Sequence, residues 1–184
     1  SITAIDKGKS VDTSMGFTPL EGLLMGTRSG NVDPGALDFL VEKEQLTSVS
    51  LSNLLNKKSG VLGVSGVSSD MRDLDAAAKD GNHRAELALK MYAYRILKYI
   101  GAYTAVLGGL DILVFTGGVG ENQIEIRAKI CSGLKYLGIE IDDNRNQLRG
   151  QDAIISSDSS RVKVAVIPTD EEFMIAIDTM ELVH

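Results

Sequence analysis

The fold is decided by one segment, Leu113-Val114-Phe115-Thr116-Gly117-Gly118-Val119-Gly120-Glu121-Asn122. An apolar, β-prone run ends at Thr116, a cluster of glycines follows, and apolar residues at helical spacing begin at Ile124. A strand, a glycine-rich turn and a helix in this order point backbone N–H groups at an anion, commonly a phosphate. The segment therefore predicts a nucleotide-phosphate site. A tight strand-to-helix connection without a ligand is the open alternative.

Two better-known phosphate motifs do not fit the chain. The dinucleotide fingerprint G-x-G-x-x-G would begin at Gly118, but Gln123 occupies the place of its third glycine. Gly8-Lys9-Ser10 has the form of the end of a Walker A loop, yet Thr3 stands where the first glycine is required.

Composition limits the class of protein. With 184 residues, of which 43% are hydrophobic, the chain can bury one substantial core. A net charge of −6 without a basic run argues against nucleic acid as a partner. Cys131 is the only cysteine, so we expect a small buried side chain and no disulfide. No apolar run reaches the length of a membrane span and no signal peptide is evident, which predicts a soluble, cytoplasmic protein with no membrane contact.

The first part of the chain predicts a hairpin and then helices. Residues 1–14 indicate two strands around a turn at 6–9, whose type the sequence leaves open. A helical segment is expected over about 19–107, and its longest helix over 84–107. The predicted apolar stripe of that helix consists of Leu87, Met91, Tyr94, Leu97 and Gly101.

The last part alternates between strand and helix patterns. We expect strands at 111–116, 138–142 and 162–167, a helix at 122–137 and another from about 170. This order predicts an α/β domain with a mixed sheet and a helical insertion. It resembles the ribonuclease-H-like domain shared by the sugar kinase, heat-shock ATPase and actin superfamily.

Several stretches together resemble the acetate kinase family, in the family's order and over essentially the whole chain. They are Ser14–Leu23, Met25–Gly30, Asp33-Pro34, Lys57–Gly66, Asp70–Arg72, Thr116–Asn122 and Ile167–Glu172.

The resemblance implies that residues 1–184 are the C-terminal nucleotide-binding domain of an acetate kinase, without its N-terminal domain. The chain opens without Met in the strand-like Ser1–Ile5, as if cut from something longer. The implied reaction moves the γ-phosphoryl group of ATP to acetate, giving acetyl phosphate and ADP, with Mg²⁺ as cofactor and a homodimer formed through this domain. We expect this chain alone to be inactive. The alternatives are a kinase for propionate or another short-chain acid, and a non-catalytic nucleotide-binding or dimerisation module.

The resemblance also implies roles for single residues. Arg28, which locally has the form of a surface arginine in a turn, corresponds to the family's transition-state-stabilising arginine; a guanidinium suits phosphate oxygens. Asp70, Met71 and Arg72 would contact the adenosine of ATP or ADP, although Asp70 also fits a helix cap.

In the glycine-rich segment, Gly118, Val119, Gly120, Glu121 and Asn122 would hold the nucleotide phosphates. Asn122 would offer a side-chain donor, whereas Glu121 is expected to point to solvent or cap a helix start.

Glu171 would bind magnesium. Thr169-Asp170-Glu171-Glu172 has the form of a capping box, in which Thr169 is the N-cap and Glu172 reaches back to it. That interpretation leaves Glu171 free for Mg²⁺. The alternative is that Glu171 and Glu172 are both exposed acids in the first turn of a helix and bind no metal.

Overall fold

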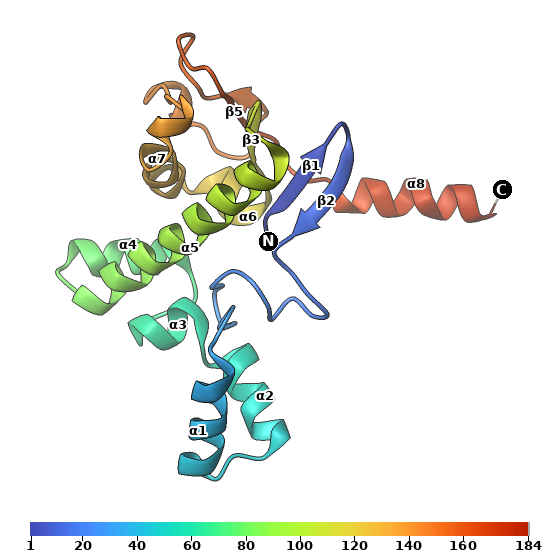
Figure 1. Ribbon diagram of the computed structural model, residues 1–184. Helices are drawn as coiled ribbons and strands as arrows, with labels where there is room; N and C mark the ends of the chain where they lie inside the picture. The colour runs from blue at the N-terminus through green and yellow to red at the C-terminus, as the bar shows by residue number, and fades with distance from the viewer. Residues whose placement is uncertain (184) are drawn as a thin grey trace. The chain divides into compact units, whose positions relative to one another are not determined.

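The chain divides into two compact units, Ser1–Gly109 and Leu110–His184. The computed structural model describes residues 1–183 and is drawn in Figure 1; His184 lies outside the described residues. The division falls two residues beyond the end expected for the helical segment. None of the helices within residues 1–183 combines the length and apolar character needed to cross a membrane.

The first unit opens with the predicted hairpin. β1 (Thr3–Asp6) pairs antiparallel with β2 (Lys9–Thr13), and Asp6 lies opposite Lys9. The two turn residues, Lys7 and Gly8, have φ of 49° and 81°. Positive φ at both central residues is the mark of a type I′ turn, whose twist matches that of the strands it joins.

Five helices follow in the first unit, and all but the third begin at a side-chain cap. Asp33 caps α1 with Pro34 at the first helical position, and Thr47 forms a capping box with Ser50 at α2. Asn82 accepts hydrogen bonds from two backbone N–H groups at the start of α5. The bounds are α1 (Pro34–Glu44), α2 (Ser48–Lys57), α3 (Gly60–Ser65), α4 (Met71–Lys79) and α5 (His83–Leu107).

The long helix α5 organises the core of this unit. Both α3 and α4 pack against it, as Figure 1 shows. Its buried side consists of Ala85, Ala88, Leu89, Ala93, Ile96, Ile100 and Tyr103.

The predicted apolar stripe of α5 was therefore wrong. Leu87, Met91 and Tyr94 are exposed at 50%, 40% and 63%. The core side combines three small alanines with larger apolar residues such as Leu89 and Ile96.

The second unit is built on a three-stranded mixed sheet. β3 (Ile112–Phe115) pairs parallel with β5 (Lys163–Val166), and β4 (Ala153–Ile154) pairs antiparallel with β5, giving the order β3-β5-β4. The central strand is the most buried, as its apolar run Val164-Ala165-Val166 predicts. The expected mixed sheet is confirmed.

The connections of the second unit differ from prediction. The expected helix 122–137 is divided into α6 (Gly117–Asn122), α7 (Ile124–Ser132) and the 3₁₀ turn η1 (Lys135–Leu137). Gln123, with φ of −100° and ψ of 87°, separates the first two. The expected strand 138–142 is reduced to a single bridge between Ile141 and Ser156, whereas β4 was not predicted. A second 3₁₀ turn, η2 (Arg145–Gln147), and the last helix, α8 (Glu171–Val183), complete the unit.

Candidate functional site

The glycine-rich segment changes the chain from strand to helix within two residues. β3 ends at Phe115, Thr116 is still extended, and Gly117 takes φ of 69° before α6 continues. That left-handed conformation strains any residue with a Cβ, so glycine is required at this point. The segment expected as a loop is thus a short helix, whose first N–H groups have no partner within the helix.

The glycines of α6 differ in their surroundings. A Cβ added at Gly118 would meet no atom within 4 Å, so packing does not demand a glycine there. A Cβ at Gly120 would lie 3.1 Å from the backbone carbon of Phe115, so a larger residue there would press on the end of β3. Open space therefore lies above the first turn of α6, where the phosphate prediction needs it.

The other members of this segment have defined partners. Val119 is half-buried, and its carbonyl accepts a hydrogen bond from the N–H of Gln123 at 2.9 Å. Asn122 donates from Nδ2 to the carbonyl of Gly118 at 3.0 Å. A primary amide has a second N–H, so one donor of Asn122 is free to reach a ligand.

Glu121 does not face the open side of α6. Its Oε1 accepts hydrogen bonds from the N–H and hydroxyl of Thr169, at 3.0 and 3.2 Å. Glu121 was expected to point to solvent or to cap a helix start, but it does neither: it binds Thr169, which precedes the cap of α8. This contact joins the glycine-rich segment to the segment that carries Glu171.

The start of α8 corrects one prediction. The cap is Asp170, whose Oδ1 accepts from the N–H of Phe173 at 3.0 Å and whose carbonyl accepts from Met174. Thr169 is instead bound to Glu121, so the predicted capping box between Thr169 and Glu172 is wrong. Aspartate is also a good N-cap residue, and because Thr169 is bound to Glu121, Asp170 takes this role.

Glu171 is the first residue of α8 and is exposed. Its neighbour Asp170 is occupied by the cap, whereas the Glu171 carboxylate has open surroundings. One carboxylate together with phosphate oxygens and waters is a normal arrangement for Mg²⁺, so the donor set fits this ion.

In the first unit, Arg28 lies in a loop that is clamped between two helices. The N–H of Ser29 donates to Leu55 at the end of α2, and the N–H of Val61 in α3 donates to the carbonyl of Met25. Gly60, with φ of 64°, makes this packing possible, because a Cβ there would lie 2.9 Å or less from three carbonyl oxygens of the loop.

The Arg28 side chain itself is little engaged. It is half-buried, and its Nη1 lies 4.0 Å from Met25 Sδ, a weak acceptor. Arg28 makes no ion pair with any residue in the described part of the chain. Its donors are available to an anionic ligand.

Asp70, Met71 and Arg72 form the start of α4. Asp70 is the N-cap, with its Oδ1 2.8 Å from the N–H of Arg72, and it also pairs with the Arg72 guanidinium at 2.5 Å. The side-chain and backbone hydrogen bonds from Arg72 lower the pKa of Asp70 to about 2. Met71 is buried at 5% exposure, so this position offers a ligand little side-chain surface.

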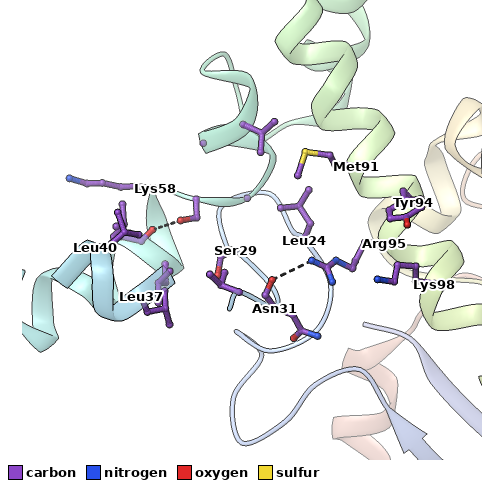
Figure 2. Close-up of a pocket in the computed structure, with 17 residues that line it drawn as sticks. Leu24, Ser29, Asn31, Leu37, Leu40, Lys58, Met91, Tyr94, Arg95 and Lys98 are labelled. Atoms are coloured by element: carbon purple, nitrogen blue, oxygen red, sulfur yellow. Dashed lines mark hydrogen bonds between the residues drawn. The ribbon is translucent and has the colours of Figure 1, made fainter. Parts of the chain in front are cut away.

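A separate pocket of about 720 Å³ opens in the first unit (Figure 2). Its walls include Leu24, Leu37 and Leu40, and the side of α5 that carries Met91 and Tyr94. Arg95 extends across it and donates to the carbonyl of Asn31 at 3.3 Å. Arg28 does not line this pocket, although its neighbour Ser29 does.

The model of the acetokinase family matches residues 1–177 of the chain. The chain belongs to the acetokinase family. The acetate kinase of Phocaeicola vulgatus is 64% identical over 184 residues, which is 100% of this chain and 46% of the relative. This acetokinase chain thus spans about half the length of the relatives that it matches.

Solved structures agree with this assignment. The crystal structure of Porphyromonas gingivalis acetate kinase has 57% identity and a TM-score of 0.94, covering 99% of this chain and 46% of that one. A propionate kinase from Francisella tularensis has 43% identity and a TM-score of 0.87, covering 95% of this chain and 44% of that one. The predicted family and fold class are confirmed.

Arg127 was not among the site residues predicted from the sequence. Arg127 in α7 is fully buried and binds the carbonyl groups at the end of α6. The available signal was a charged residue among Ile126, Ile130 and Cys131, the buried apolar residues of that helix.

Proposed function

We propose that this chain is the C-terminal, nucleotide-binding part of an acetate kinase, which reversibly transfers the γ-phosphoryl group of ATP to acetate. The observation that carries the proposal is the 64% identity to an acetate kinase over the whole of this chain, which covers 46% of that relative. Catalysis of phosphoryl transfer depends on positioning the reactants and stabilising charge, and the residues described above are suited to both.

In this proposal the nucleotide phosphates bind at Gly118–Asn122. The open space above Gly118 and the N–H groups of the first turn of α6 support it. The adenosine contacts the start of α4, where the exposed Arg72 and the half-buried Asp70 offer polar groups. The burial of Met71 limits its own contribution to a small apolar surface.

Arg28 would stabilise the charge of the phosphoryl group during transfer, because its guanidinium is available while its backbone is firmly held. Arg28→Ala in the full-length protein should lower kcat strongly and leave ADP binding nearly intact. An Arg28→Ala variant with a normal kcat would show that Arg28 does not stabilise the transition state.

Glu171 would hold Mg²⁺, which when bound supplies positive charge to the phosphate oxygens. Glu171→Gln should therefore raise the Mg²⁺ concentration needed for half-maximal turnover, whereas Glu172→Gln should not. If Glu172→Gln raised this Mg²⁺ concentration and Glu171→Gln did not, Glu172 would be the magnesium ligand.

A propionate kinase is the second candidate, because a solved propionate kinase shares 43% identity with this chain. The 64% identity to the acetate kinase of Phocaeicola vulgatus favours acetate. Phosphoryl transfer by the full-length protein, measured with acetate and with propionate, separates these two. Absence of transfer to either acid would instead favour the non-catalytic module.

A homodimer formed through the first unit completes the proposal. The exposed apolar residues of α1, α2 and α5 support it, among them Phe39, Val49, Leu87 and Tyr94. Light scattering of the full-length protein should give a dimer, and Tyr94→Glu should shift it toward monomer. A monomer throughout the micromolar range would contradict the dimer.

A further inference from the structure

Arg127 is a buried cation with no acid at ion-pair distance among residues 1–183. Its side chain is fully buried, and it makes no ion pair within residues 1–183. Burying a charge without a counter-ion is costly unless its hydrogen bonds are satisfied. A buried cation at such a position therefore needs hydrogen-bond partners for all of its donors.

The guanidinium satisfies its donors entirely with oxygen atoms of neutral groups. Nη1 donates to the carbonyls of Gly120 and Glu121, and Nη2 donates to those of Asn146 and Leu148. Nε donates to Oδ1 of Asn146. All five distances are 2.8 Å, so the side chain joins two backbone segments with fixed geometry.

One of these segments is the last turn of α6. The carbonyl groups of that turn carry the negative end of the helix dipole, and a cation there is favourable. Because α6 has only six residues, a constraint on its last turn also fixes its first turn. Asn146 strengthens the arrangement, since it is buried and its Nδ2 donates to the carbonyl of Ile124 at 3.1 Å.

We propose that Arg127 is a positioning residue for the nucleotide, which fixes α6 so that its first-turn N–H groups are held ready for the phosphates. Arg127 itself touches no substrate. The inference rests on the proposed function, because it requires phosphate binding at Gly118–Asn122.

The test measures ATP and acetate KM in the full-length protein for Arg127→Lys and Arg127→Met. Lysine keeps the charge but cannot reproduce the planar, five-donor pattern. Losing one hydrogen bond to a charged phosphate weakens binding about tenfold or more, so we expect ATP KM to rise by about that factor, with acetate KM unchanged. If Arg127→Met does not fold, Arg127→Lys and Asn146→Ala carry the test, and the asparagine variant should show a smaller rise.

Ile155→Ala provides the control for a loss of stability alone. Ile155 is fully buried in the same unit and makes none of the contacts of Arg127. An equal rise of ATP KM in this control would overturn the inference. Unchanged ATP KM in the Arg127 variants, together with a raised ATP KM in Gly118→Ala, would also overturn the inference. If Gly118→Ala had no effect either, the proposed phosphate site would itself be wrong.

Discussion

Gly118 and Gly120 lie two residues apart in α6 but serve different purposes. No atom lies within 4 Å of a Cβ added at Gly118, whereas a Cβ at Gly120 presses on Phe115. Gly118→Ala should keep or raise the free energy of unfolding, by up to about 1 kcal/mol, because alanine favours helix. It should nonetheless raise ATP KM severalfold, since the methyl group enters the proposed phosphate site.

Gly120→Ala is the matched variant and should lower stability by roughly 1–3 kcal/mol through overpacking. Thermal unfolding and steady-state kinetics of both variants measure the contrast. A Gly118→Ala protein with wild-type ATP KM would mean that the space above α6 holds no phosphate.

The pairing of Asp70 with Arg72 makes a prediction about pH. The pKa of Asp70 is lowered from 3.8 to about 2, because Arg72 binds the charged carboxylate. A lowered pKa in the folded state stabilises the fold above about pH 4, and this contribution is lost as the pH falls toward about 2. An NMR titration of the Asp70 carboxyl carbon should give a midpoint near 2.

Arg72→Gln should move that midpoint back toward 3.8, though incompletely, because the backbone N–H of residue 72 still donates to Asp70. Arg145→Gln is the control, since Arg145 lowers the pKa of Asp158 and makes no contact with Asp70. An Asp70 midpoint near 3.8 in the unaltered protein would show that the pair does not form in solution.

At the scale of elements, the start of α8 depends on Asp170. Asp170→Ala should cost about 0.5–2 kcal/mol of local helix stability, because the N–H of Phe173 loses its acceptor. Amide hydrogen exchange of Phe173 should become faster by a matching factor, while Glu172→Gln leaves it unchanged. Faster exchange in Glu172→Gln alone would restore the capping box inferred from the sequence.

Elements with strong local signals were predictable, and those set by tertiary contacts were not. The hairpin turn, the Pro34 start of α1 and β3 were visible because turn chemistry, capping and apolar runs act locally. The buried side of α5 was misjudged because three of its residues, Ala85, Ala88 and Ala93, are small, and a search for large apolar residues overlooks them. β4 spans two residues, too few to show an alternating pattern.

The candidate site shows the same division. The segment Gly117–Asn122 could be found because a cluster of glycines after a strand pattern indicates a tight turn. For Arg127 the only signal was a charge on an apolar helix side, and it did not reveal the partners, the carbonyl groups of Asn146 and Leu148, which lie about twenty residues away in the chain.

At the scale of the whole molecule, this chain spans 46% of its acetate kinase relatives, so we expect it to lack activity alone. Alignment of two reactants can contribute roughly 7–11 kcal/mol to lowering a barrier, and no residue predicted above binds the acetate. The purified chain should form no acetyl phosphate from ATP and acetate, whereas the full-length protein should. Product formation by the chain alone, unaffected by Arg28→Ala, would show that the active site has been misplaced.

The burial of Cys131 has a practical consequence for spectroscopy. It is the only cysteine, it is 2% exposed, and burial raises its pKa to about 12. Its thiol should therefore react with an aromatic disulfide reagent only as fast as the second unit unfolds, unlike a thiol added at an exposed position. Lys79→Cys and Lys135→Cys would place one reactive thiol in each unit, and a dye pair attached there would report movement between the units without removal of the native cysteine.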